Sequence, residues 1–197
     1  AKAQIHDDWH VLGLRGTGGN SFTVKDLLVP HEFTCPLGDI ATGSPKRGGP
    51  LYQLGIPGFI INEHMALAFG IAFRALDEVR ALAQKKYRSY GPPFSSVAED
   101  PLFRTELGEH FSKLSMLRKG ALALLEEMWQ TVLKENTVCP ELQAGVRAAA
   151  VTITEAASNA VDMAFRYGGA GALFEENPLQ QCKLDMCAAA QHLMVSR

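Results

Sequence analysis

The sequence lacks the features that mark two common classes of protein. It has no excess of basic residues, because 19 Lys and Arg face 21 Asp and Glu and leave a formal charge of −2 at pH 7. A nucleic-acid-binding domain normally carries a basic excess or a basic stripe. No uninterrupted apolar run approaches the roughly 18–20 residues that a membrane span needs. We therefore expect neither nucleic acid nor a membrane as a partner.

Several short chemical motifs are also missing. The four cysteines form no CxxC pair, the six histidines have no partners at metal-ligand spacing, and no GxSxG sequence occurs. We therefore predict no metal site and no serine-hydrolase chemistry. A cytoplasmic protein with small, buried and reduced thiols is the simplest interpretation of the cysteines.

The first 57 residues have a different character from the rest. They hold 9 of the 18 glycines and 5 of the 10 prolines, and they show no helical apolar period. Residues 9–14 and 22–29 are predicted to be strands, joined by a glycine-rich turn over residues 15–20. Because two strands alone are marginal in water, this segment should belong to a larger sheet.

From about residue 57 onward, apolar residues recur at three- and four-residue steps. Breaks near residues 90–93, 136–139 and 168–171 divide this part into four helices, the last running from Pro178 to about Val195. Three of them span about 27–35 residues by pattern, where the usual globular helix has about 11–12. We predict a mainly α fold, an up-down four-helix bundle of long helices preceded by a short β segment. We divide the chain into a β segment with a linker, residues 1–56, and the four-helix bundle, residues 57–197.

The helix that opens at Pro140 is rich in small residues, which let neighbouring helices approach closely, so we place it at the centre of the bundle. A bundle of long helices often exposes a second apolar face. We therefore expect the chain to form oligomers.

Three candidate sites stand out on chemistry alone, each with a plainer alternative. The glycines of residues 167–171 precede a helix, so their N–H groups and the helix N-terminus favour a phosphate; a helix C-cap and tight turn would use glycine equally well. Glu175 and Glu176 follow the glycines. A carboxylate near an apolar pocket can act as a base. The alternative is that the two negative charges complement the dipole at the start of the last helix. His192 lies beside an alanine patch and suits a proton shuttle; it could equally be packed in a helix interface.

Five short motifs resemble signatures of one enzyme family. Trp9-x-x-x-Gly13-x-Arg15-Gly16-Thr17-Gly18 and Val24-x-Asp26-x-x-Val29-Pro30 are similar to the closing β-domain signature of the acyl-CoA dehydrogenases. Tyr167-Gly168-Gly169-Ala170-Gly171-Ala172-Leu173-Phe174 and Asn177-Pro178-Leu179-Gln180 resemble their C-terminal signature. Leu184-Asp185-x-x-Ala188-Ala189-x-Gln191-His192 is similar to one branch, the flavin-dependent aromatic hydroxylases often labelled type 2.

The resemblance implies a longer protein. The family fold has an N-terminal helical domain, a middle β-domain and a C-terminal four-helix bundle, and this chain matches only the end of the β-domain and the bundle. The chain also begins without Met, so we expect a fragment, inactive alone, of a flavin-dependent oxidoreductase of the hydroxylase (monooxygenase) branch. Such a fragment would contribute flavin contacts and form a dimer or tetramer, with a flavin reductase as partner and a small aromatic or acyl-CoA substrate.

The resemblance also assigns roles to single residues. Gly168, Gly169 and Gly171 would contact the diphosphate or adenosine part of FAD (alternatively FMN), often one bound mainly by a neighbouring subunit. Arg88 falls near the family's cofactor-binding arginine. His192 would be the acid/base beside the flavin ring.

In a dehydrogenase, Glu175 or Glu176 would instead abstract the α-proton of an acyl-CoA, and Glu63 lies close to an alternative base position. The chain departs from the family at Gln181, where arginine is usual, and at Leu184-Asp185, where an Arg-Asp pair is usual. Losing both cations should weaken phosphate or flavin contacts. The proline after the glycines arrives one residue later than in dehydrogenases, which favours the hydroxylase branch. An acyl-CoA dehydrogenase and an inactive oligomerisation bundle remain the two alternatives.

Overall fold

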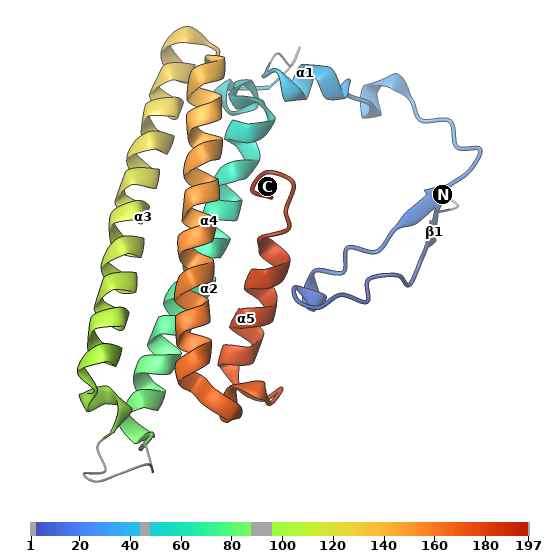
Figure 1. Cartoon of the computed structure of the whole chain (residues 1–197). Helices are drawn as coiled ribbons and strands as arrows, with labels where there is room; N and C mark the ends of the chain where they lie inside the picture. The colour runs from blue at the N-terminus through green and yellow to red at the C-terminus, as the bar shows by residue number, and fades with distance from the viewer. Residues whose placement is uncertain (1–2, 44–47, 88–95, 197) are drawn as a thin grey trace.

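The computed structural model describes residues 3–43, 48–87 and 96–196, and a bundle of four helices forms its core (Figure 1). These are α2 (Gly55–Lys85), α3 (Pro101–Glu135), α4 (Pro140–Gly168) and α5 (Pro178–Ala189). The first three have 31, 35 and 29 residues, as their apolar patterns predict. The expectation of a mainly α bundle after a short β segment is confirmed.

Helix α4 lies at the centre of the bundle and packs against α2, α3 and α5. Its buried positions are mostly small, with Ala157, Ala160 and Ala164 fully covered by neighbouring helices. The α2 positions facing it, among them Ala68 and Ala72, are small as well. Small residues on both sides let the helices approach closely, which is the arrangement that the composition of α4 predicts.

The ends of the long helices follow local sequence rules. Asp100 accepts a hydrogen bond from the backbone N–H of Leu102 (2.9 Å) at the start of α3, with Pro101 as its first residue. Asn136 ends α3 in the left-handed conformation (φ 56°), and Pro140 opens α4. Asparagine tolerates positive φ, and proline's missing N–H costs nothing at a helix start. Sequence therefore places these boundaries correctly.

Helix α5 is shorter than predicted. It has 12 residues and ends at Ala189, so the expectation that it runs to about Val195 is wrong. Residues 190–196 form tight turns instead, in which the N–H of His192 donates to the carbonyl of Ala189 (3.1 Å). The guanidinium Nε of Arg147 on α4 donates to the carbonyl of Met194 (3.2 Å) and Val195 is buried, so tertiary contacts hold these turns in place.

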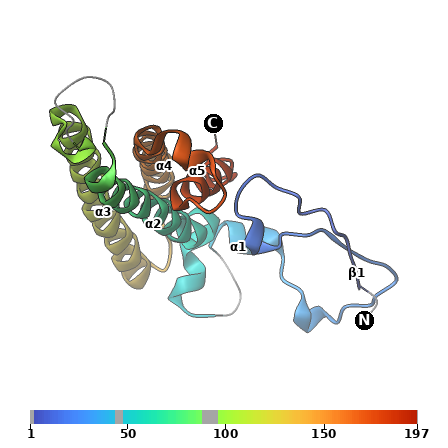
Figure 2. The same ribbon diagram turned by 90° about the horizontal axis from the view of Figure 1, so that it is seen from below.

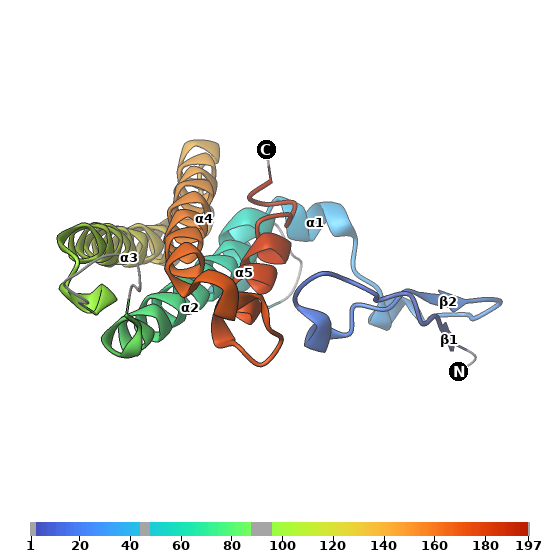
Figure 3. The ribbon, with the colours of Figure 1, turned by 60° about the horizontal axis from the view of Figure 1, so that its bottom comes forward.

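The N-terminal segment leaves the bundle on the side of α5 and projects away from it (Figures 2 and 3). It contains one antiparallel pair, β1 (Ala3–Ile5) and β2 (Phe22–Val24). The predicted strand at residues 9–14 is not present, and β2 stops at Val24 instead of residue 29. Leu14 and Asp26 adopt positive φ (54° and 50°), which interrupts extended backbone at these two positions.

The remaining elements are short. They are η1 (Arg15–Thr17), η2 (His31–Phe33), α1 (Leu37–Ala41), η3 (Pro50–Leu54), η4 (Val97–Glu99) and η5 (Gly169–Leu173). Every hydrophobic core residue of the described ranges lies at or after Leu54. The side chains of Leu28, Phe33 and Ile5 are 91%, 76% and 73% exposed. The described part of the chain thus leaves these three apolar side chains without cover, whereas Leu14 packs against the core.

The cysteines only partly follow the expectation of buried thiols. All four are free; Cys182 is buried and Cys187 half-buried, whereas Cys35 and Cys139 are exposed. Burial raises the pKa of the Cys182 thiol.

One helical stretch, Pro50–Lys85, is long and apolar enough by length and composition to cross a membrane. That is weak evidence, because a core helix passes the same test, and the buried face of α2 packs on α4.

Candidate functional site

His192 lies in the turns that follow α5, on the side of the bundle where α2 passes. Its imidazole is exposed and stacks on that of His64, with ring centroids 5.4 Å apart and planes 24° from parallel. The backbone N–H of Met194 donates to Nδ1 of His192 (3.3 Å). One face of the His192 ring therefore packs against a neighbouring helix, and the residue is still exposed. Both sequence interpretations, packing in a helix interface and an accessible acid/base, are compatible with this position.

His64 comes from α2 and is buried, with only 7% of its surface exposed. Its Nε2 lies 3.1 Å from the hydroxyl of Thr154 on α4. Burial, and secondarily the charge of His192, lower the pKa of His64 below its ordinary range. His64 is thus uncharged at neutral pH, because an imidazole out of water favours its neutral form.

The glycine loop at the end of α4 is mainly a helix cap. A Cβ on Gly168 would lie 2.7 Å from the Cβ of Ala172, and Gly169 has φ +63°. These two glycines are required by packing and backbone conformation, as the C-cap interpretation states. Around Gly171 nothing lies within 4 Å of an added Cβ. Of these three glycines, Gly171 is therefore the one whose backbone a ligand can approach closely.

A lysine that no sequence motif singled out binds the carbonyl groups at the start of this loop. The ammonium of Lys86 donates to the carbonyls of Tyr167 (2.7 Å) and Gly168 (2.9 Å) at the C-terminus of α4. A cation there complements the negative end of the helix dipole. Arg88, the predicted cofactor arginine, lies outside the described residues.

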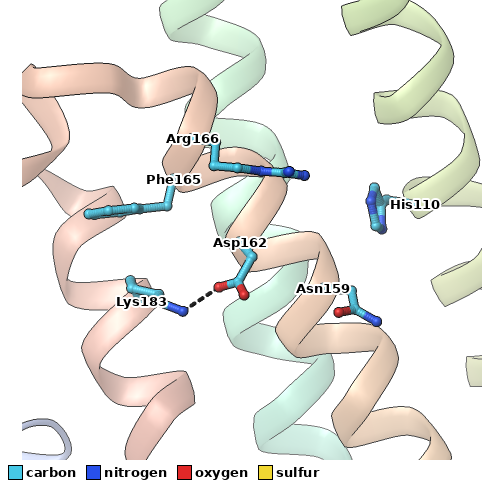
Figure 4. Close-up of a pocket in the computed structure, with 6 residues that line it drawn as sticks. All are labelled: His110, Asn159, Asp162, Phe165, Arg166 and Lys183. Atoms are coloured by element: carbon cyan, nitrogen blue, oxygen red, sulfur yellow. Dashed lines mark hydrogen bonds and ion pairs between the residues drawn. The ribbon is translucent and has the colours of Figure 1, made fainter.

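A cleft of about 560 Å³ opens along α4, and Arg166, two residues before Gly168, is its lining residue nearest the loop in sequence (Figure 4). Its walls are His110 from α3, Lys183 from α5, and Asn159, Asp162, Phe165 and Arg166 from α4. Lys183 forms an ion pair with Asp162, which raises the pKa of Lys183. In Figure 4 Arg166 extends toward His110, whose pKa burial lowers. Two permanent cations against one carboxylate make the cleft net positive.

Glu175 and Glu176 are exposed in the turn before α5. Their position fits dipole complementation at a helix start better than a base in an apolar pocket. His192 lies at the other end of this helix, about 18 Å away at 1.5 Å per residue over 12 residues. Glu63, one position before His64, is exposed on α2. The structure therefore does not bring Glu175 and Glu176 into one site with His192.

The N-terminal and C-terminal motifs meet at α5. The backbone N–H of Leu14 donates to Oδ1 of Asp185 (2.7 Å), and a Cβ on Gly13 would lie 2.1 Å from the carbonyl oxygen of Leu184. Gln181 and Leu184, the two positions without the expected arginine, line a cleft of about 540 Å³ together with Arg15 and Glu175. Sequence reasoning missed this docking, although Gly13 and Asp185 both belong to the quoted motifs.

Sequence reasoning also missed His64, Thr154 and Lys86. His64 could have been found, because it interrupts an otherwise apolar stripe beside Ile61, Met65 and Ala68. A lone polar residue on a buried helix face requires a partner. Nothing local marks Lys86 or Thr154.

Comparison with known proteins gives one family. A family model described as "Acyl-CoA dehydrogenase, C-terminal domain" matches residues 63–197. The indole-3-acetate monooxygenase of Pseudomonas putida is 25% identical over 192 residues, covering 98% of this chain and 48% of the relative. The oxygenase subunit HsaA of a flavin-dependent monooxygenase from Mycobacterium tuberculosis is 26% identical over 193 residues, covering 96% and 49%. The chain spans about half the length of the curated relatives it matches.

Solved structures show the same fold. The 3-HSA hydroxylase from Rhodococcus sp. RHA1 superposes with a TM-score of 0.85 at 24% identity, covering 98% of this chain and 51% of that one. XiaF from Streptomyces sp., solved in complex with FADH2 and glycerol, superposes with a TM-score of 0.82 at 19% identity, covering 98% and 50%.

Proposed function

Because the chain belongs to the family of acyl-CoA dehydrogenase C-terminal domains, we propose that it is the helical half of a flavin-dependent monooxygenase that hydroxylates a small aromatic compound. The observation that carries the proposal is the set of relatives: an indole-3-acetate monooxygenase, a pigment production hydroxylase and HsaA match 95–98% of this chain. A flavin reductase that supplies reduced flavin is the partner that HsaA, an oxygenase subunit, suggests.

The residues near the glycine loop suit the diphosphate end of FAD. Arg166 and Lys183 give the cleft of Figure 4 a net positive charge, and the open backbone at Gly171 leaves room for close approach. Phosphate groups favour such cations, arginine above all because its guanidinium binds bidentately. Gly168 and Gly169 would act indirectly, by shaping the loop. FAD is preferred to FMN in this proposal because only a dinucleotide has the diphosphate that this cleft would hold.

His192 is the residue that we assign to proton transfer. The flavin, when bound, supplies the redox chemistry that carries oxygen to the substrate. The imidazole of His192 is accessible to a ligand, and histidine is the side chain that most often serves as a general acid or base, so it can give a proton to a leaving oxygen or take one from a phenolic substrate. Glu175 and Glu176 lie at the other end of α5 and are exposed, which favours the hydroxylase branch over an acyl-CoA dehydrogenase.

Self-association is part of the proposal. On α3, Phe111, Leu122 and Leu133 recur at a spacing that places them on one face of the helix, and they are 52%, 59% and 48% exposed. Such a row of apolar side chains on one helix suits a contact with a second copy, in a dimer or tetramer. We place the assembled protein in the cytoplasm, without nucleic acid or membrane as a partner.

Two reduction experiments on the full-length protein that contains this chain test the proposal. In the first, the bound flavin is reduced anaerobically by NADH and a flavin reductase, oxygen is admitted, and a panel of phenols and indoles is assayed for hydroxylated product. We expect product, and we expect loss of at least about 100-fold in kcat with His192→Gln, the range of a lost general acid/base. His10→Gln, an exposed histidine of the N-terminal segment, is the matched control and should behave as wild type.

In the second experiment an acyl-CoA is the only reductant. Bleaching of the flavin by the acyl-CoA alone would refute the hydroxylase assignment and establish a dehydrogenase. A full-length protein that binds no flavin would refute both, and would favour the inactive oligomerisation bundle.

A further inference from the structure

Buried polar side chains are rare in this protein, and two of them lie together under His192. Within the described residues only His64, Ser96 and Thr154 are polar and buried. His64 and Thr154 are bonded to each other across 90 residues of sequence, from α2 to α4. Burying a polar pair costs more than an apolar pair of the same shape unless both groups are fully hydrogen-bonded. Its position under an exposed, stacked histidine suggests what it does.

The hydrogen bonds determine which ring nitrogen of His64 carries the proton. The hydroxyl of Thr154 lies 2.8 Å from the carbonyl oxygen of Ala150, and a carbonyl can only accept. The single hydroxyl hydrogen therefore points to Ala150, and the hydroxyl oxygen accepts from His64. Nε2 of His64 must be the protonated nitrogen, and in the neutral ring Nδ1 is bare.

The ring of His192 is held by two contacts. One face stacks on His64 at 5.4 Å, and Nδ1 accepts from the backbone N–H of Met194 at 3.3 Å. A nitrogen that accepts cannot bear a hydrogen, so the neutral ring of His192 carries its proton on Nε2. The turn itself is anchored to α4 through the bond from Arg147 to the carbonyl of Met194 (3.2 Å).

We infer that His64 is a positioning residue: locked by Thr154 in one orientation and one tautomer, it supports the ring of His192 so that the protonated Nε2 is the nitrogen offered to substrate. Because His64 stays uncharged, it does not repel the positive charge that His192 acquires when it takes up a proton. The catalytic consequence rests on the proposed function, whereas the tautomers and the stacked geometry are properties of this chain.

The first test measures the tautomers directly, by 15N NMR of the histidine rings in the 197-residue chain at a pH where both rings are neutral. For His64 and for His192 we expect Nε2 to resonate as a protonated nitrogen and Nδ1 as a bare one. A ring-to-ring NOE should join the two residues. Finding the proton of His192 on Nδ1, or no NOE, would overturn the inference.

Variants then test the coupling. His64→Leu removes the stacked ring, and we expect the two nitrogen shifts of His192 to move toward the average of a freely exchanging imidazole. Thr154→Val should disturb the shifts of His64 first and those of His192 through it, while Thr154→Ser, which keeps the hydroxyl, should restore the wild-type shifts. His10→Gln should leave all of them unchanged. Unaltered His192 shifts in a folded His64→Leu or Thr154→Val protein would refute the positioning role.

The enzymatic arm uses the full-length protein. We expect His64→Leu to lower kcat about 10- to 100-fold with little change in KM, the cost of a catalytic group that is no longer held in place. Should His64→Leu fail to fold, the Thr154→Val and Thr154→Ser pair and the wild-type tautomers still decide the question. If the tautomers are as expected but the full-length protein has no hydroxylase activity, the proposed function is refuted and the geometry of the histidine pair stands. Full kcat in a folded His64→Leu protein that hydroxylates would refute the positioning role alone.

Discussion

Replacing Gly13 by alanine tests how the N-terminal segment is attached to the bundle. A Cβ at this position would lie 2.1 Å from the carbonyl oxygen of Leu184 and 2.7 Å from the backbone nitrogen of Asp185. Both are backbone atoms within α5, which cannot yield without breaking the helix. The segment must therefore move away from α5, and the bond from the N–H of Leu14 to Oδ1 of Asp185 (2.7 Å) is lost with it.

The size of the effect follows from that bond. A hydrogen bond to a charged group contributes about 1.5–3 kcal/mol, and we take about 1–2 kcal/mol because this one is partly exposed. At about 1.4 kcal/mol per factor of ten, the open state of the segment becomes about 5- to 30-fold more populated. The hydrophobic core begins only at Leu54, so the midpoint of global unfolding should stay close to that of the wild type.

Hydrogen exchange at the amide of Leu14 is the assay, followed by NMR alongside the thermal unfolding of the bundle. We expect exchange at Leu14 to accelerate by the same 5- to 30-fold factor in Gly13→Ala. Gly16→Ala is the matched control, because nothing lies within 4 Å of its added Cβ. Wild-type protection of Leu14 in Gly13→Ala would show that the close approach to α5 is not what holds the segment.

Three further changes have outcomes that the structure sets. Burial and the charge of His192 lower the pKa of His64 below its ordinary value of 6.5, so below about pH 6.5 the unfolded chain binds a proton there that the folded chain does not, and the free energy of unfolding should fall as the pH drops. Urea titrations at several pH values should show a weaker pH dependence of this free energy in His64→Gln than in the wild type. An equal pH dependence in the two proteins would contradict the lowered pKa. Cys182, buried with a raised pKa, should react with a thiol reagent far more slowly in the native chain than exposed Cys35, the two rates converging in denaturant. Ala157→Leu should destabilise the protein by about 1–3 kcal/mol in chemical denaturation, because it overpacks the centre of the bundle. Ala148 is exposed on the same helix, and Ala148→Leu should be close to neutral. An equal loss of unfolding free energy in the two variants would refute the central position of α4.

Most of the bundle could be predicted because its helices are long and periodic. Periodicity over about 30 residues averages out single exceptions, and Pro101, Asn136 and Pro140 mark boundaries by their own backbone chemistry. Shorter elements were predicted less well. The end of α5 and the loop over residues 9–14 depend on contacts with residues far along the chain, such as Arg147 with Met194, which no local pattern reveals.

The candidate site was predicted in its parts but not in its arrangement. His192, the glycine loop and the two glutamates were all singled out from sequence. The sequence order itself puts the glutamates and His192 at opposite ends of α5, because Glu175 and Glu176 precede Pro178 and His192 follows Ala189. The partners of His192 were missed because His64 and Thr154 come from two other helices, and only packing brings them together.

The sequence by itself determined the class of fold, the order and extent of the three long helices, and the family, because these depend on periodicity and on motifs that are local in the chain. Only the tertiary structure decided that Gly168 and Gly169 serve the loop's own conformation, that Gly13 and Leu14 dock on α5, and that His192 rests on a buried, neutral His64. Each of these depends on distances between segments that are remote in sequence, and such distances are fixed by the way the helices pack.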